Sequence, residues 1–203
     1  MIAIIDYGMG NLASVKNAFL KLGYDALTTS HPEEILRAEK VVLPGVGAFA
    51  DAILNIRQRG IDKTIFELVE RETPLLGICL GLQLLFTESD ENGLHKGLDI
   101  IPGRVQKFEI PSHYKVPQIG WNSIEVNPSS RLLEGIPSDS YFYFVHSYYV
   151  IPEDEAVVAA RTEYGIEFVS AIEKGRIFAA QFHPEKSSQM GLKILKNFGG
   201  IRV

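Results

Sequence analysis

Leu75-Leu76-Gly77-Ile78-Cys79-Leu80-Gly81 contains the only cysteine of the chain, between two glycines at the end of an apolar run. The run predicts a buried strand over 75–79, and the leucine-rich residues after it predict a helix over 80–87. Glycine inside a regular element costs roughly 0.5–1 kcal/mol relative to alanine, so the two glycines indicate a tight strand-to-helix turn that exposes the cysteine. The start of a helix favours the reactive thiolate. The alternative is an inert cysteine in the core.

Strand and helix patterns alternate on both sides of this segment. The N-terminal half predicts strands at Ile2–Ile5, Tyr24–Thr28 and Val41–Leu43, and helices at Asn11–Leu22, Ala48–Arg57 and Ile61–Arg71. The C-terminal half predicts strands at Arg104–Ile110, Ile119–Val126, Tyr141–Val145, Val157–Thr162, Phe168–Glu173 and Arg176–Phe182, and a closing helix at Met190–Phe198 followed by Gly199 and Gly200. This order favours an open, mostly parallel sheet with helices on both faces and an antiparallel excursion in the C-terminal half. We expect the strand that ends at Cys79 to be central, because open α/β sheets bind ligands at the carboxyl ends of their strands.

His183 is the predicted partner of Cys79, since a cysteine nucleophile needs a base and the base needs a group that orients it. It follows a buried strand and precedes Pro184, which ends the strand because proline cannot donate a ladder hydrogen bond. Glu185 stands two residues further on and, in extended backbone, would point the same way as His183. The other interpretation is a strand-end histidine that pairs with a surface glutamate.

His146 is the competing base. It follows the aromatic run 141–145 and opens Ser147-Tyr148-Tyr149, which we interpret as a pocket-lining loop, and no carboxylate lies near it in sequence. A structural histidine whose ring nitrogens are satisfied is the equal alternative. The other three histidines (His31, His95 and His113) read as loop residues. With one cysteine and no H-x-x-x-H spacing, the sequence predicts no metal site.

Pro44-Gly45-Val46-Gly47 follows a short β-branched strand and leads into a helix. Glycine lets backbone N–H groups approach a ligand closely, so this loop would supply one donor of an oxyanion hole, with the amide of Leu80 as the other. Taken alone, the loop is an ordinary strand-to-helix turn.

Bulk composition is that of a globular protein. At 203 residues, with 46% hydrophobic and 22% charged residues, the chain suits one domain, 1–203, with a sizeable core. The net charge of −5 weighs against nucleic acid as a partner, and a single cysteine excludes an internal disulfide and fits a reducing cytosol. The apolar N-terminal stretch is too short for a signal peptide, and no run approaches the ~20 residues of a membrane helix. We therefore expect a cytoplasmic protein.

Gly8-Met9-Gly10-Asn11-Leu12-Ala13 matches the dinucleotide pattern G-x-G-x-x-G/A after a strand. The acidic residue that this pattern requires at the end of the second strand is missing, because Asp25 begins that strand and Thr28 to Ser30 end it. We expect no nucleotide cofactor, and no other cofactor is predicted.

Three motifs, Pro44–Gly47, Gly77–Gln83 and His183–Glu185, resemble in this order the triad class of glutamine amidotransferases. Over essentially the whole chain, further segments resemble the glutaminase subunits of imidazole glycerol phosphate synthases. They are Ile4–Asn11, Lys96–Leu98, Ile119–Asn122, Tyr143–Tyr148 and Phe182–Ser187. One departure is visible: the family usually has Pro-His before Gly-Trp-Asn, where this chain has Pro117-Gln118. That departure affects local contacts rather than the chemistry.

The resemblance implies a class I amidotransferase-like, flavodoxin-like fold and the hydrolysis of glutamine to glutamate and ammonia. Cys79 would attack the side-chain amide carbon and form a thioester. His183 would take the thiol proton and pass it to the departing ammonia, while Glu185 orients His183. Backbone N–H groups of Val46, Gly47 and Leu80 would hold the oxyanion.

The resemblance also implies a substrate site and a partner. Its substrate-binding residues would be Gly45, Gln83, His146, Ser147 and Tyr148, with an ordinary helix residue as the alternative for Gln83. The ammonia would pass to a cyclase subunit of (β/α)₈-barrel fold, which makes imidazole glycerol phosphate and an aminoimidazole carboxamide ribotide in histidine biosynthesis. The interface residues of this heterodimer would be Gly10, Asn11, Trp121 and Asn122, with a core tryptophan as the equal alternative for Trp121.

Three rivals stay open. One is a glutaminase that serves a different synthase, and another is a cysteine hydrolase or peptidase on a similar sheet. The third is a non-catalytic binding subunit, which would be expected to lose Cys79, His183 or Glu185, and all three are present.

Overall fold

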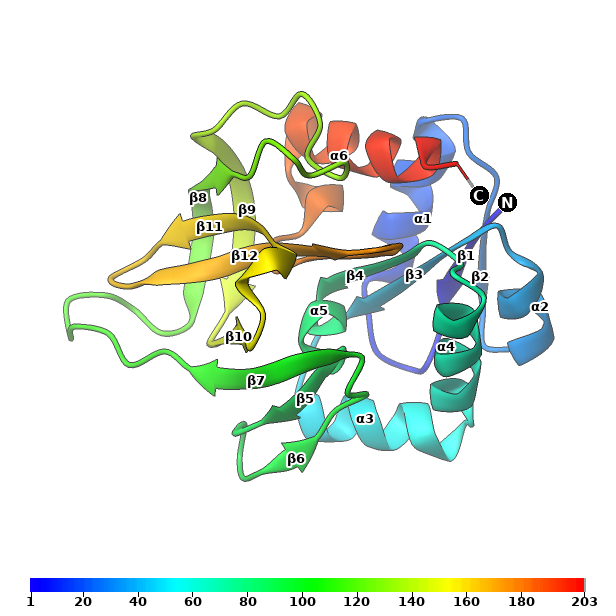
Figure 1. The fold of residues 1–203 in the computed structure, drawn as a ribbon, viewed down its shortest axis with the longest axis horizontal. Coiled ribbons are helices and arrows are strands. Elements are labelled where there is room, and N and C mark those ends of the chain that lie inside the picture. Colours follow the sequence, from blue (N-terminus) through cyan, green and yellow to red (C-terminus); the bar gives the residue numbers. More distant parts are fainter. Residues whose placement is uncertain (203) are drawn as a thin grey trace.

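Thirteen strands form one sheet in the computed structural model, which describes residues 1–202 (Figure 1). The last residue of the predicted domain 1–203 lies outside the described residues. The strands are β1 (Ile2–Ile5), β2 (Ala26–Thr29), β3 (Lys40–Gly45), β4 (Leu75–Cys79), β5 (Phe86–Ser89), β6 (His95–Lys96), β7 (Ile101–Lys107), β8 (Gln118–Val126), β9 (Ser140–His146), β10 (Tyr148–Pro152), β11 (Val158–Glu163), β12 (Glu167–Lys174) and β13 (Ile177–Ala180). The α-helices are α1 (Leu12–Lys21), α2 (Pro32–Arg37), α3 (Phe49–Gln58), α4 (Ile61–Glu70), α5 (Leu80–Leu84) and α6 (Ser188–Gly200), and 3₁₀ turns span Glu155–Val157 and Pro184–Lys186.

The centre of the sheet is parallel, in the order β2-β1-β3-β4-β13. Every residue of β1, β3, β4 and β13 is buried, as expected for parallel strands that are covered on both faces. β4 lies between β3 and β13, so the strand that ends at Cys79 is central, as the sequence predicts.

The C-terminal half adds the expected antiparallel part. β13 pairs antiparallel with β12, β12 with β10, and β10 with β7. β8 and β9 form an antiparallel pair at the side of this sheet, joined to it through β11 (Figure 1). The predicted fold class is therefore confirmed.

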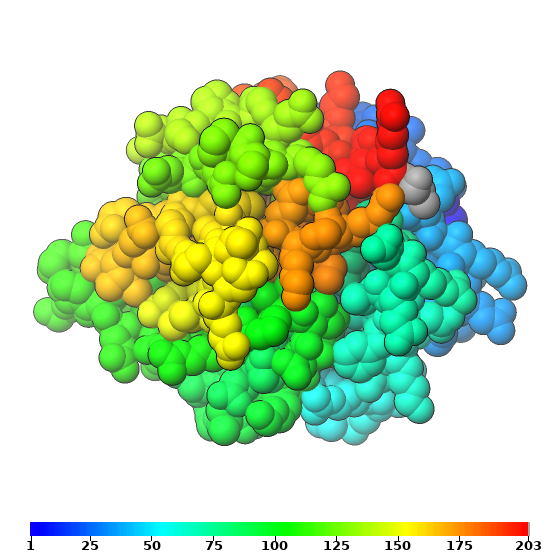
Figure 2. Space-filling view, viewed as in Figure 1, coloured from blue at the N-terminus to red at the C-terminus, as the bar shows by residue number. Residues whose placement is uncertain are grey.

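Helices cover both faces of the parallel strands (Figure 1). α1 and α6 pack on one face, where they contribute Phe19, Ile194 and Phe198 to a buried cluster, and α3 and α4 contribute Phe49 and Ile65 to the cluster on the other face. α6 packs against α1, and the red C-terminal segment lies close to the blue N-terminal part in Figure 2. No helix within residues 1–202 combines the length and the apolar character that crossing a bilayer takes.

The helix predicted over 80–87 is wrong in its second half. α5 ends at Leu84, and Phe86–Ser89 is strand β5, which pairs with β7 and β6. Phe86 is fully buried in that sheet, so strand pairing outweighs the helical pattern of the leucines. The closing helix is longer than predicted, because α6 takes in both Gly199 and Gly200.

Several predicted boundaries also shift, and some short elements were not predicted. The strand predicted over 176–182 ends at Ala180, and the strand predicted over 104–110 covers 101–107. The elements α2, β5, β6 and β10 were missed, and β10 begins at Tyr148, within the stretch interpreted as a loop. They are short, and pairing with distant strands stabilises β10, a contact that no local pattern reveals.

Candidate active site

Cys79 ends β4 and precedes α5 with φ 54° and ψ −108°. Positive φ is unusual for a residue with a side chain and is retained mainly where the surroundings enforce it, as at a strained nucleophile turn. The turn is as sharp as predicted, but the side chain is 6% exposed rather than exposed. It faces a cleft that the residues after β9 help to cover. The helix dipole that was predicted to favour the thiolate is weak, because α5 has only five residues.

The two flanking glycines are required by close backbone packing. A Cβ at Gly77 would lie 2.8 Å from the carbonyl oxygen of Gly81, and a Cβ at Gly81 would overlap the carbonyl oxygen of Leu43 in β3. The turn therefore packs directly on the neighbouring strand.

The Pro44–Gly47 loop lies beside Cys79. In the parallel pair β3–β4, Gly45 is in register with Cys79, so Val46 and Gly47 follow at the carboxyl end of β3. A cleft of about 420 Å³ opens there. It is lined by Val46, Gly47, Cys79, Leu80, Gln83, Glu91, Pro117, Val145, His146, Ser147, Tyr148, His183 and Lys186. Of the residues predicted for catalysis, the oxyanion hole and the substrate, only Gly45 and Glu185 do not line it.

His183 and Glu185 form a buried pair: Nδ1 of His183 lies 2.8 Å from Oε1 of Glu185, and their side chains are 2% and 1% exposed. The predicted extended backbone is wrong, because Pro184–Lys186 forms a 3₁₀ turn. This turn nevertheless places the carboxylate of Glu185 within hydrogen-bonding distance of the His183 ring. Ser187 fixes it by donating its hydroxyl to the carbonyl of His183, at 2.6 Å.

Nε2 of His183 is buried and makes no hydrogen bond within residues 1–202, although the ring faces the same cleft as Cys79. Burial alone would lower the pKa of His183, but the nearby sulfur of Cys79 and the hydrogen bond and charge of Glu185 outweigh burial and raise the pKa. A raised pKa and a free, buried Nε2 suit a group that accepts a proton from the thiol.

His146 is placed differently. Its Nδ1 lies 2.8 Å from the carbonyl oxygen of Tyr148 and its Nε2 lies 2.9 Å from Oε1 of Gln118. Complete burial lowers its pKa to about 4, so the ring is neutral at pH 7, and Nδ1 donates to the carbonyl. Neutral Nε2 then accepts, and we assign the amide of Gln118 the turned orientation that presents an N–H. Both ring nitrogens are satisfied, which favours a structural histidine over a base.

We expect acid to destabilise the fold through His146. Its native pKa of about 4 lies below the unfolded value of 6.5, so the unfolded chain binds the proton more readily between these values. The free energy of unfolding should therefore fall as the pH drops from 6.5 toward 4, with a contribution of up to about 3 kcal/mol from this residue. Urea titrations at pH 7.0 and 4.5 measure it. A His146→Gln variant should lose that part of the pH dependence, and an unchanged dependence would contradict the assignment.

Gln83, one of the predicted substrate-binding residues, already forms hydrogen bonds within the protein. Nε2 of Gln83 donates to the carbonyl of Tyr148 and to Oε1 of Gln181, both at 3.1 Å. Gln83 is 5% exposed, so its amide N–H group is not free for a ligand in this structure. Sequence reasoning missed Gln181, although a lone polar residue in the apolar run before His183 was a usable signal. It also missed the lining residues Glu91, Pro117, Val145 and Lys186, which no motif marks.

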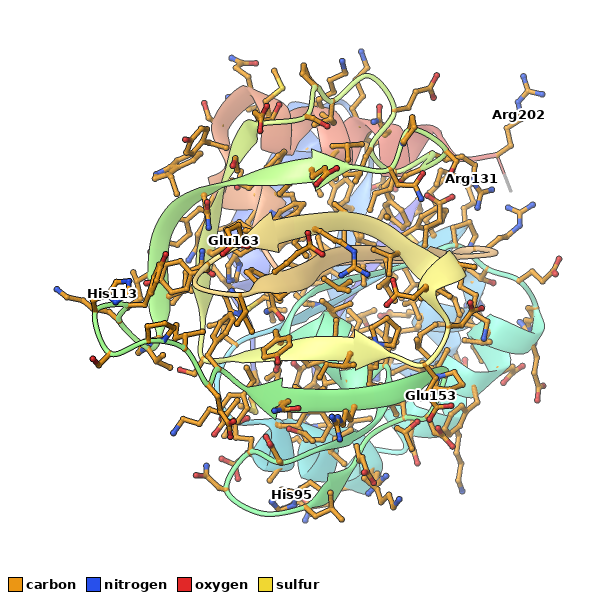
Figure 3. All side chains as sticks on the ribbon, turned by 60° about the vertical axis from the view of Figure 1, so that its left-hand side comes forward. His95, His113, Arg131, Glu153, Glu163 and Arg202 are labelled. Atoms are coloured by element: carbon orange, nitrogen blue, oxygen red, sulfur yellow. The ribbon has the colours of Figure 1, made fainter. Side chains whose placement is uncertain are left out.

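The predicted interface residues lie outside the cleft. Trp121 is 52% exposed on β8, so the core alternative for this residue is wrong. The side chain of Asn122 is used internally, since its Nδ2 donates to the carbonyl of Glu163 at 2.9 Å (Figure 3 labels Glu163). Gly10 and Asn11 are half-buried between β1 and α1.

The remaining histidines are peripheral. His113 lies at the left edge of the molecule in Figure 3 and His95 at its lower edge, and His95 belongs to β6 rather than to a loop. The residues that the structure describes include no group of three or more His, Cys, Asp or Glu side chains arranged to hold a metal ion. A cavity of about 950 Å³ beside α6 is lined by no cysteine or histidine.

The chain is similar to known proteins over nearly its whole length. Residues 3–200 match the family model described as glutamine amidotransferase class-I. A protein of Moorella thermoacetica named imidazole glycerol phosphate synthase subunit HisH is 55% identical over 200 residues, covering 98% of this chain and 94% of that protein. One of the same name from Syntrophotalea carbinolica is 53% identical, covering 99% and 100%. A crystal structure of a glutamine amidotransferase has a similar fold, with a TM-score of 0.77 at 22% identity over 98% of this chain and 100% of that one.

Proposed function

Because the chain belongs to the class-I glutamine amidotransferase family, we propose that its cleft hydrolyses glutamine and supplies ammonia for histidine biosynthesis. The observation that carries the chemistry is the buried His183–Glu185 pair, whose free Nε2 faces the cleft that holds Cys79. The enzyme is the glutaminase subunit of an imidazole glycerol phosphate synthase. It works as one domain over residues 1–203 in the cytoplasm.

The reaction begins with the proton of Cys79. Transfer from Sγ to Nε2 of His183 leaves a thiolate and an imidazolium, and the carboxylate of Glu185 stabilises the imidazolium through Nδ1. The thiolate attacks the side-chain amide carbon of glutamine. The resulting tetrahedral oxyanion is held by backbone N–H groups of Leu80 and of the Val46-Gly47 loop, which follows β3 in register with Cys79.

The intermediate then collapses. His183 returns its proton to the departing nitrogen, ammonia leaves, and a thioester joins Cys79 to the glutamyl group. A water molecule then gives a proton to His183 and attacks the thioester carbon, which forms a second oxyanion in the same hole. The C–S bond breaks, glutamate leaves, and His183 returns the proton to the thiolate of Cys79. Ser147, Tyr148 and the cleft face of Gln83 hold the amino-acid end of the substrate. His146 lines the cleft but supports it through its own hydrogen bonds.

The ammonia passes to a cyclase subunit, which we propose to be a (β/α)₈ barrel. The β8–β9 pair presents exposed apolar side chains beside the cleft: Ile119 is 63% exposed, Trp121 52% and Tyr141 59%. Pro117, just before β8, and Val145, near the end of β9, line the cleft, so this face is continuous with the site. A contiguous apolar face of this kind marks a protein interface. Gly10 and Asn11 would border it.

Measuring glutamate release from glutamine tests the function. The purified chain should be assayed alone, with a barrel cyclase, and with that cyclase plus its nucleotide ligand, and Cys79→Ala serves as the blank. Activity that rises strongly with the liganded cyclase supports the proposal. Full activity without any response to that cyclase would indicate a different synthase, and no Cys79-dependent release under any condition would reject the glutaminase.

Trp121 should matter for the complex and little for the fold. Its ring is half-exposed and makes one edge contact with Tyr143, so replacement by alanine removes little core packing. Aromatic residues at the centre of an interface often contribute 2 kcal/mol or more, so we expect Trp121→Ala to weaken cyclase binding roughly 30-fold or more. Calorimetric titration with the cyclase measures this affinity, and thermal unfolding of the free chain is the control. Unchanged affinity, or loss of the fold, would count against the interface role.

A further inference from the structure

A row of buried side-chain amides leads to the sulfur of Cys79. Nε2 of Gln83 donates to the carbonyl of Tyr148 and to Oε1 of Gln181, and Nε2 of Gln181 lies 3.7 Å from Sγ of Cys79. Gln181 is 0% exposed and Gln83 5%. Gln181 directly follows β13, the strand that pairs with β4, and stands two residues before His183.

The orientation of each amide is determined by the row itself. The carbonyl of Tyr148 only accepts, so Gln83 must present an N–H to it, and the second N–H of the same NH₂ group meets Gln181. Gln181 must therefore accept with Oε1, which leaves its own N–H groups directed at Sγ. Neither amide can turn over without setting two like atoms against each other.

We infer that Gln181 is a further catalytic residue of the proposed glutaminase, an N–H donor that stabilises the thiolate of Cys79, and that Gln83 positions it. The inference rests on the proposed function for its role in turnover. Gln181 keeps its proton throughout, because the proton of the thiol goes to His183. A hydrogen bond to an ionised acceptor is stronger than one to a neutral group, so the donor favours the charged sulfur over the neutral thiol.

The surroundings of the sulfur make such a donor useful. On another side, Sγ lies 3.9 Å from the carbonyl oxygen of Val145, an acceptor that cannot stabilise a negative sulfur. α5 contributes only a five-residue helix dipole. With the cysteine 6% exposed, water contributes little, so a protein donor such as the amide of Gln181 matters for the thiolate.

Alkylation of Cys79 by iodoacetamide tests the inference on the thiol itself. Since Cys79 is the only cysteine, the rate as a function of pH reports its thiolate alone. Gln181→Met keeps the length of the side chain and removes the donor, and we expect it to move the midpoint of this pH profile upward by about one pH unit or more. Gln83→Met leaves Gln181 in place but releases its orientation, and should move the midpoint in the same direction by less.

Ser170→Ala is the matched control. The carbonyl of Ser170 accepts from the backbone N–H of Gln181, and its own hydroxyl is buried without a partner, so the change removes a buried polar group nearby without touching the row. It should leave the midpoint unchanged. A folded Gln181→Met protein with the wild-type midpoint overturns the inference. If that variant does not fold, Gln83→Met decides, and a wild-type midpoint there overturns it.

The readout separates the inference from the proposed function. Alkylation needs no glutamine and no cyclase. If the variants shift the midpoint while the wild-type chain shows no glutaminase activity, the donor role is supported and the glutaminase is rejected. If the wild-type chain has glutaminase activity and the variants keep its midpoint, the glutaminase is supported and the donor role is rejected.

Discussion

Replacing His183 by asparagine is expected to lower glutamate release about 10³–10⁴-fold, measured as kcat with the liganded cyclase present. The substitution removes the one imidazole nitrogen in the cleft that is buried without a partner. Without it, the proton of Cys79 has no acceptor and the departing nitrogen has no donor. The pair with Glu185 is lost as well, which leaves a buried carboxylate uncompensated. Thermal unfolding must therefore accompany the assay.

The two histidines of the cleft give this prediction its control. His146→Gln removes the competing base, but Gln118 and Tyr148 already occupy its ring nitrogens. We expect a much smaller loss of activity and an unchanged shape of the pH–rate profile near neutral pH, whereas His183→Asn should remove the dependence on an imidazole base altogether. A result with the two variants exchanged would make His146 the base and reject the triad. Comparable losses for Glu185→Gln and His183→Asn would show that the carboxylate and the ring act as one unit.

The sequence predicted the parallel half of the fold well because its strands are continuous apolar runs. β1 and β4 have the predicted bounds, and β3 contains the predicted Val41–Leu43 but continues through Pro44 to Gly45. Prediction failed where pairing across long sequence distances decides the structure. β5 was assigned to a helix because leucines precede it, yet its partner β7 begins only at Ile101. β10 was interpreted as a loop, yet it pairs with both β7 and β12.

The same distinction between local and long-range signals applies to the candidate site. Cys79 and His183 could be found because glycine or proline marks the chain around each: Cys79 ends β4 between Gly77 and Gly81, and Pro184 follows His183. The contact between Gln181 and Cys79 could not, because it joins residues 102 positions apart through one hydrogen bond. The function of Gln118 was equally hidden. The sequence marked it as a departure from the family pattern, and only the fold places it against His146.

Gly81→Ala is expected to lower the free energy of unfolding by about 3 kcal/mol or more. The added Cβ would overlap the carbonyl oxygen of Leu43 and lie 2.9 Å from its carbonyl carbon. These are backbone atoms of the central strand β3, so no side-chain rotation relieves the overlap. Either β3 and α5 move apart or the strained turn at Cys79 opens. For a chain of 203 residues the loss corresponds to roughly 6–12 °C in Tm, which thermal and urea unfolding measure.

Gly200→Ala is the matched substitution, because a Cβ there meets no atom of residues 1–202 within 4 Å. At the end of α6 it should be neutral or stabilise by up to about 1 kcal/mol, since alanine loses less backbone entropy in a helix than glycine. The contrast separates the two uses of glycine in this chain, close backbone contact and conformational freedom. Opening the turn would also move the amide of Leu80 away from the oxyanion position, so any folded Gly81→Ala protein should lose activity beyond its loss of stability. Wild-type stability for Gly81→Ala would mean that the turn does not pack on β3, and the placement of Cys79 beside the Val46-Gly47 loop would fall with it.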